Sequence, residues 1–143
     1  MISIRLDGDK SIAHRALILS SIISGPSEIY NAPDCDDTYS TISCLLSLGI
    51  AVEKDNKSIK VVGGKFKNDI KIDAGESGTT ARLMVGLIAG LGIRSSIVCS
   101  GSLASRPMAR IISPLQKMGA YIESSNNLLP IRILKGISSG GSY

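Results

Sequence analysis

The segment GESGTTAR, at residues 75–82, decides the fold, because an earlier segment has the same framework. The earlier segment is GDKSIAHR, at residues 8–15, and the offset is 67 residues at both the first glycine and the final arginine. An apolar run and then a glycine follow each segment, and these glycines, Gly25 and Gly92, are again 67 residues apart. Internal similarity at a fixed period indicates that one supersecondary unit occurs twice.

Each copy continues with the same order of expected elements. A short strand precedes a second helical pattern, which ends at Gly49 or Gly119, and two strands close the copy. The short strands are expected at residues 27–30 and 95–98, and the closing strands at 50–54, 58–62, 120–124 and 130–134. The pairs Asp55-Asn56 and Asn126-Asn127 are typical of hairpin turns. The sequence therefore predicts an α/β (α+β) chain with two copies of a β-α-β-α-β-β unit.

Capping signals predict where the helices begin and end. Ser11 is the candidate N-cap of the first helix, which we expect to run to about Ser24 and to end at a left-handed Gly25. Acidic residues favour a helix N-terminus, so Asp36 and Asp37 indicate the start of the second helix. The third helix is expected to open at Ser77 or Thr79, and the fourth to follow Ser105 and Pro107 and to end before Gly119.

Length and composition indicate one folded domain. With 43% hydrophobic and 20% charged residues, the 143-residue chain can bury a core. No apolar run has the length of a membrane span, and the first residues lack the layout of a signal peptide, so we expect a cytoplasmic protein without a membrane partner. Three widely spaced cysteines and one histidine exclude the usual zinc arrangements, and no metal or cofactor is expected.

The polar composition narrows the class of ligand. One Phe, four Tyr and no Trp provide few stacking platforms, which argues against a nucleic-acid partner. The excess of 16 basic over 12 acidic residues is mild. It favours a protein that binds small anions over one that coats a polyanion.

The first candidate site lies at the start of the first helix. A helix N-terminus offers unpaired N–H groups and the positive end of the helix dipole, and is therefore suited to an anion. Lys10 adds a point charge and Ser11 a hydroxyl, and Arg15 shares a helix face with Ser11. Three donors can then converge on one phosphate or carboxylate. A capped surface helix with solvated charges is the alternative interpretation.

Two further motifs offer similar chemistry. At residues 75–82 the glycines allow close backbone approach to a ligand, and hydroxyls follow Gly78. A serine-hydrolase elbow needs Gly-x-Ser-x-Gly and a histidine base, which this motif does not supply. Arg106 stands just ahead of the fourth helix, where it can clamp an anion through two N–H groups. His14 is expected to be partly exposed and inert, and the acids at residues 34–37 to serve the helix start instead of a metal.

The three motifs together resemble the 5-enolpyruvylshikimate-3-phosphate synthase family. The matching segments are residues 8–17, 75–83 and 105–108 with Pro114-Leu115, in the order and spacing of the family. Members have somewhat over 400 residues, in two domains that each contain three β-α-β-α-β-β units. The resemblance implies that residues 1–143 form part of an N-terminal domain, with one repeat at about 1–65, a second at about 66–136, and a truncated linker or strand start at 137–143.

The resemblance also implies roles for six residues. Lys10 resembles the lysine shared by the shikimate-3-phosphate and phosphoenolpyruvate sites, and Ser11 and Arg15 resemble the shikimate-3-phosphate contacts. Gly78 and Arg106 resemble the phosphoenolpyruvate contacts, and Thr79 lies beside Gly78 at the substrate. Glu76 departs from the asparagine of many members, and no role is transferred to it.

The implied reaction transfers the carboxyvinyl group of phosphoenolpyruvate to the 5-hydroxyl of shikimate-3-phosphate, with release of phosphate, in the shikimate pathway to aromatic amino acids. The catalytic acid and base groups are expected beyond Tyr143, in the missing C-terminal domain of the same protein, so this chain alone is a half-site and is expected to be inactive. Two alternatives remain open. One is the related UDP-N-acetylglucosamine 1-carboxyvinyltransferase, and the other is a non-catalytic module that binds small anions.

Overall fold

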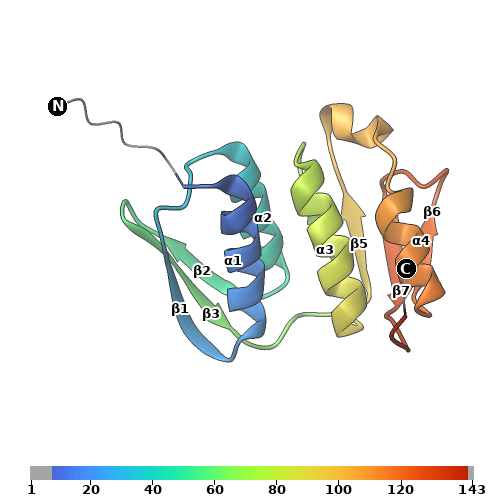
Figure 1. Cartoon of the computed structure of the whole chain (residues 1–143), viewed down its shortest axis with the longest axis horizontal. Helices are drawn as coiled ribbons and strands as arrows, with labels where there is room; N and C mark the ends of the chain where they lie inside the picture. The colour runs from blue at the N-terminus through green and yellow to red at the C-terminus, as the bar shows by residue number, and fades with distance from the viewer. Residues whose placement is uncertain (1–7, 142–143) are drawn as a thin grey trace.

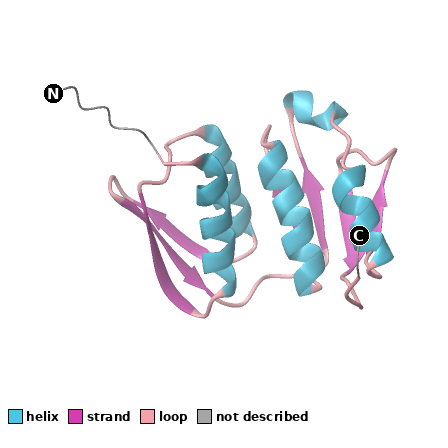
Figure 2. Cartoon of the chain, in the orientation of Figure 1, coloured by secondary structure: helices cyan, strands magenta, loops and turns pink. Residues whose placement is uncertain are grey.

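The computed structural model describes residues 8–141 of the chain, which form two sheets, each covered by helices (Figures 1 and 2). The first set of elements is α1 (Lys10–Ile22), β1 (Gly25–Tyr30), α2 (Asp36–Ser47), β2 (Ala51–Lys54) and β3 (Ser58–Gly63). The second set is β4 (Ile70–Asp73), α3 (Gly78–Leu91), β5 (Ser95–Val98), the 3₁₀ helix η1 (Gly101–Ser105), α4 (Ala109–Lys117), β6 (Tyr121–Ser124) and β7 (Ile131–Lys135). The α/β fold class with two similar sets of elements is confirmed.

The two sheets share one topology. The first has the order β1-β3-β2 and is antiparallel throughout, and the second places β5, β7 and β6 in the same order. The strand β4 adds to the edge of the second sheet, parallel to β5. The corresponding strand ahead of α1 was predicted by the repeat, but it falls on residues outside the described part of the chain.

Both predicted hairpins are present. β2 and β3 pair around Asp55-Asn56, where the Asp55 carboxylate accepts the backbone N–H groups of Lys57 and Ser58. β6 and β7 pair around Asn126-Asn127, and both asparagines adopt positive φ angles, 51° and 55°. Asparagine tolerates this left-handed conformation better than most residues, so the turn chemistry fits the sequence.

A continuous core joins the two halves. Leu17 of α1, Leu45 of α2, Met84 of α3 and Ile131 of β7 are all fully buried members of one cluster. Helix α3 packs against both α1 and α2, so the helices of the first half meet those of the second. Figure 1 shows that α1, α2, α3 and α4 begin at the same edge of the molecule.

Some predicted helix ends are wrong. The N-cap of α1 is Asp9, not Ser11, because the Asp9 carboxylate accepts the N–H of Ile12 at 2.8 Å. The helix ends at Ile22, and Gly25 is the first residue of β1 and not a helix stop. Helix α4 begins at Ala109, later than expected, because η1 occupies the preceding connection and uses Ser105 for its own turn. The starts of α2 at Asp36 and of α3 after Ser77 are confirmed.

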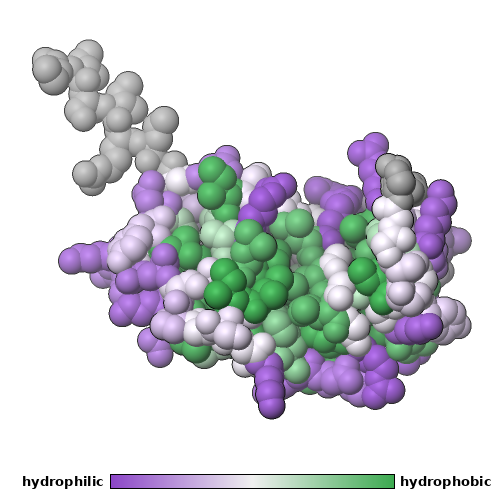
Figure 3. Space-filling model, turned by 60° about the horizontal axis from the view of Figure 1, so that its bottom comes forward, coloured by the Kyte–Doolittle hydropathy of each residue, from purple (hydrophilic) through white to green (hydrophobic). Residues whose placement is uncertain are grey.

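An apolar area lies on the side of the surface where α1 ends. Three large hydrophobic residues of α1 are exposed, Ile12, Leu19 and Ile22, and so is Ile23, which follows the helix. Figure 3 is turned so that the side where α1 ends comes forward, and it shows hydrophobic residues gathered on this face. Among residues 8–141, no helix is both long and apolar enough to cross a membrane.

Candidate functional site

The start of α1 carries three of the predicted substrate-binding residues. Lys10 is the first residue of the helix, and Ser11 follows it; both are exposed. Arg15 is also exposed, and its Nη1 donates to the backbone carbonyl oxygen of Ser11 at 2.8 Å. The bond folds the arginine back along the first turn of the helix. The side chains of Lys10 and Arg15 therefore add positive charge to the positive end of the helix dipole.

The start of α3 combines a cap with a close backbone approach. Ser77 is the N-cap, and its hydroxyl accepts the N–H of Thr80 at 3.3 Å. Gly78, the first residue of the helix, is buried, whereas Thr79 is exposed. A Cβ atom on Gly78 would lie 2.8 Å from Nη1 of Arg82 and 3.6 Å from Nη1 of Arg106. Glycine therefore keeps the space in front of two guanidinium groups open.

Arg106 reaches this space from the loop between η1 and α4. It is exposed, and its Nη2 donates to the hydroxyl of Ser102 at 3.3 Å. Glu76 holds η1, which leads into this loop, since its Oε1 accepts the N–H of Ser102 at 3.0 Å. Gly101 permits this contact, because it has a φ of 55° and a Cβ there would collide with the Glu76 carboxylate. The structure thus brings Arg106 to Gly78 and gives Glu76 a role in shaping the loop.

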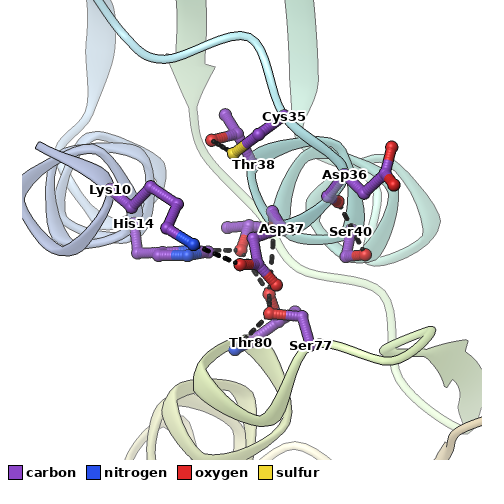
Figure 4. Close-up of polar contacts among 10 residues, drawn as sticks. Lys10, His14, Cys35, Asp36, Asp37, Thr38, Ser40, Ser77 and Thr80 are labelled. Carbon is purple, nitrogen blue, oxygen red and sulfur yellow. Dashed lines mark hydrogen bonds and ion pairs between the residues drawn. The ribbon is translucent and has the colours of Figure 1, made fainter. Parts of the chain in front are cut away.

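Lys10 is linked to the start of α3 through Asp37 of α2 (Figure 4). Its Nζ lies 3.0 Å from Oδ2 of Asp37, and the hydroxyl of Ser77 also hydrogen-bonds to this carboxylate. These bonds lower the pKa of Asp37, the Lys10 bond more than the Ser77 bond, and the Asp37 bond raises the pKa of Lys10. Both groups are therefore charged at neutral pH, and the starts of α1, α2 and α3 are connected.

His14 is buried, contrary to the expectation that it is partly exposed. Its side chain is 2% exposed, and its Nδ1 lies 2.7 Å from the hydroxyl of Thr41. Burial disfavours the charged imidazolium and lowers the pKa of His14 below its ordinary value, so the ring is neutral at pH 7. No local feature of the sequence indicates this burial, because the partner of His14 lies 27 residues away on another helix.

A pocket of about 350 Å³ lies beside this link, between the starts of α2 and α3. Its lining is acidic and comprises Cys35, Asp36, Asp37, Ser40, Glu76 and Ser77. The predicted cationic residues Lys10, Arg15 and Arg106 do not line it. Within residues 8–141 no group of three or more His, Cys, Asp or Glu side chains could hold a metal ion.

The geometry defines a class of protein, an α/β repeat domain that gathers helix N-termini, one lysine and two exposed arginines at a single edge. The family model described as EPSP synthase (3-phosphoshikimate 1-carboxyvinyltransferase) matches residues 2–142, and the chain belongs to this enzyme family.

Individual relatives agree with the family match. The 3-phosphoshikimate 1-carboxyvinyltransferase of Alkaliphilus metalliredigens is 43% identical over 143 residues, which cover 95% of this chain and 33% of the relative. That of Salinibacter ruber is 39% identical, with coverage of 96% and 33%. The solved structure of EPSP synthase from Acinetobacter baumannii superposes with a TM-score of 0.87 at 26% identity, over 97% of this chain and 33% of that one. The chain thus spans about a third of the length of the relatives that it matches.

Proposed function

We propose that this chain supplies one part of the substrate site of a 3-phosphoshikimate 1-carboxyvinyltransferase. In that reaction the 5-hydroxyl of shikimate-3-phosphate gives up its proton and its oxygen bonds to the central carbon of phosphoenolpyruvate, while the double bond opens and the methylene carbon takes up a proton. Loss of phosphate from this tetrahedral intermediate, together with a proton from the new methyl group, restores the double bond and leaves the carboxyvinyl ether. The proposal rests on the open space at Gly78, which is the first residue of α3 and lies beside the guanidinium group of Arg106. The family match favours this activity over the related UDP-N-acetylglucosamine transferase and over a non-catalytic anion-binding module.

The proposal assigns two anion sites to two helix starts. At α1, Lys10, Ser11 and Arg15 bind shikimate-3-phosphate, with Lys10 shared between the two substrates. At α3, Gly78 and Arg106 bind phosphoenolpyruvate, and Thr79 lies beside them. Both substrates are polyanions, so these groups act by electrostatic clamping and orientation. Residues 1–65 and 66–136 are, in this proposal, two repeats of one domain.

General acid and base catalysis requires a carboxylate, lysine or histidine with a tuned pKa. Asp37 is bound to Lys10, and His14 is buried among hydroxyl groups, so neither is available to a substrate. The proposal therefore places the acid and base groups in a further domain of the kind that the longer relatives have room for. Phosphate release by the 143-residue chain is accordingly expected to be no faster than that of Lys10→Ala.

Titration of the 143-residue chain by NMR tests the two sites. We expect millimolar binding, on the order of −4 kcal/mol, that weakens with salt because it is electrostatic. Arg15→Ala is expected to weaken shikimate-3-phosphate by roughly tenfold and phosphoenolpyruvate much less, and Arg106→Ala to do the reverse. Arg94→Ala is the control, because Arg94 follows the far end of α3 and pairs with Asp69. Equal losses for both ligands in both variants would show that the two sites are wrongly divided.

A further inference from the structure

Six polar residues form two layers across the starts of three helices. Each helix contributes two of them, three or four residues apart on one face: Lys10 and His14 from α1, Asp37 and Thr41 from α2, and Ser77 and Thr80 from α3. The outer layer is the Lys10–Asp37–Ser77 link described above. The inner layer is buried and joins His14 to Thr41 at 2.7 Å and Thr41 to Thr80 at 2.7 Å. A bond of 2.9 Å from the Thr80 hydroxyl to the Ser77 hydroxyl connects the two layers.

The charge on Asp37 fixes the direction of every bond in this relay. An ionised carboxylate only accepts, so the single proton of the Ser77 hydroxyl points to Asp37. The Thr80 hydroxyl has one proton, which it donates to the Ser77 oxygen at 2.9 Å, with the backbone carbonyl oxygen of Asp37 as a longer acceptor at 3.4 Å, so this proton is not directed at Thr41. The Thr80 oxygen must in turn accept from Thr41.

His14 stands at the end of this sequence of donors. The Thr41 proton is already used toward Thr80, so the Thr41 oxygen can only accept from Nδ1 of His14. The imidazole is neutral and has one N–H, because burial opposes its protonation. The proton must therefore be on Nδ1. The opposite tautomer would reverse the Thr41 and Thr80 hydroxyls and would leave Ser77 with one proton for two acceptors, Asp37 and Thr80.

We propose that Asp37 is a positioning residue, which aims the ammonium group of Lys10 and, through Ser77, Thr80 and Thr41, holds His14 as its Nδ1–H tautomer. Because the buried layer joins His14, Thr41 and Thr80 from three different helices, a shift of any of the three helix starts would leave a buried polar group without a partner. Such a group is costly in a low-dielectric interior. The relay thus fixes the α1 and α3 anion sites relative to each other. Only the role of those sites rests on the proposed function.

The nitrogen resonances of the His14 ring test the relay without any substrate. The chain has one histidine, so a ¹⁵N spectrum of the imidazole reports His14 alone. We expect Nδ1 to be protonated and Nε2 to be unprotonated in the wild-type chain at pH 7.5. The reverse assignment in the wild-type spectrum would by itself overturn the proposal.

Two alanine variants isolate the effect of the carboxylate. Asp37→Ala removes the carboxylate acceptor, so the Ser77 proton can turn back toward Thr80. The Thr80 proton then favours Thr41 at 2.7 Å over the backbone carbonyl of residue 37 at 3.4 Å, and we expect His14 to change to the Nε2–H tautomer. The Lys10 side-chain resonances are expected to shift as well. Asp36→Ala is the matched control, because it removes an exposed carboxylate from the same first turn of α2. It is expected to leave both signals unchanged, and identical spectra for the two variants would contradict the role of Asp37.

A second pair of variants covers the case in which Asp37→Ala does not fold. Thr41→Val interrupts the relay and is expected to abolish the wild-type His14 signature, whereas Thr41→Ser keeps the hydroxyl and is expected to restore it. A wild-type signature in Thr41→Val would overturn the relay. A failure of shikimate-3-phosphate and phosphoenolpyruvate to bind would overturn the proposed function and leave these spectra unaffected, so the two proposals fail separately.

Discussion

Arg15 and Arg82 occupy the same position in the two copies and differ in one bond. Each donates from Nη1 to the backbone carbonyl four residues earlier, at 2.8 Å to Ser11 and at 3.1 Å to Gly78. Arg82 also donates from Nη2 to the carbonyl of Pro107 at 3.2 Å, a bond without a counterpart for Arg15 within residues 8–141. The repeat thus preserves the position of an arginine, while one copy leaves it exposed to solvent and the other uses it to hold a loop.

The connections into the second helix of each copy differ in charge. In the first copy the start of α2 is acidic, and Asp37 pairs with Lys10. In the second copy the connection contains η1, and Arg106 reaches the start of α3 from it. In the first copy Asp37 therefore offsets the positive charge of Lys10. In the second copy Arg106 adds positive charge at the start of α3. The same fold unit supplies a rigid link in one half and an open cationic space in the other.

The largest expected effect concerns one glycine near the end of the last strand of each copy. It tests whether both copies pack this glycine closely against the end of their first helix. A Cβ on Gly63, at the end of β3, would lie 2.0 Å from the carbonyl oxygen of Ile23, and a Cβ on Gly136, after β7, would lie 2.5 Å from that of Ala89. Both oxygens belong to backbone that ends the first helix of the copy. Gly63→Ala is expected to lower the free energy of unfolding by about 3 kcal/mol, and Gly136→Ala by roughly 2 kcal/mol.

Chemical denaturation measures both changes, and Gly64→Ala is the control because no atom lies within 4 Å of its Cβ position. We expect this control to change stability by no more than about 0.5 kcal/mol. If Gly63→Ala were as mild as Gly64→Ala, the close contact between β3 and α1 would not be a constraint on the fold.

The next effect concerns His14, which has no histidine counterpart in the second copy. The folded state lowers the pKa of His14 below the ordinary 6.5, so between the two pKa values the unfolded chain binds more protons than the folded chain. Stability is therefore highest above pH 6.5 and falls as the pH decreases below it, by at most about 1.4 kcal/mol per pH unit. Denaturation at pH 7.5 and 5.5 measures this loss.

His14→Gln removes the titrating ring, and its stability is expected to change less over the same pH interval, although its stability at pH 7.5 is lower because the bond to Thr41 is altered. An equal decrease for the wild-type chain and His14→Gln would show that His14 is not the group responsible.

The repeat could be predicted from the sequence because its signals are local. Turn pairs such as Asp55-Asn56 and the cap at Ser77 act within a few residues, and the structure confirms both. The choice between Asp9 and Ser11 as N-cap could not be predicted from the sequence, because both residue types cap helices about equally well. The burial of His14 and the role of Asp37 were missed, since their partners lie 27 or more residues away and become neighbours only when the three helices pack.

The smallest expected effect returns to the two equivalent arginines. Arg82→Ala removes two bonds, including the one that joins the start of α3 to the loop before α4, and is expected to lower the free energy of unfolding by about 1 kcal/mol. Arg15→Ala removes only a bond within the exposed first turn of α1, so its stability is expected to stay within about 0.5 kcal/mol of the wild type. Because the Pro107 carbonyl lies next to Arg106, Arg82→Ala is also expected to shift the amide resonances of the Arg106 loop, which Arg15→Ala leaves in place. Equal stabilities for the two variants, with the loop unmoved in both, would mean that the second bond of Arg82 does not distinguish the two copies.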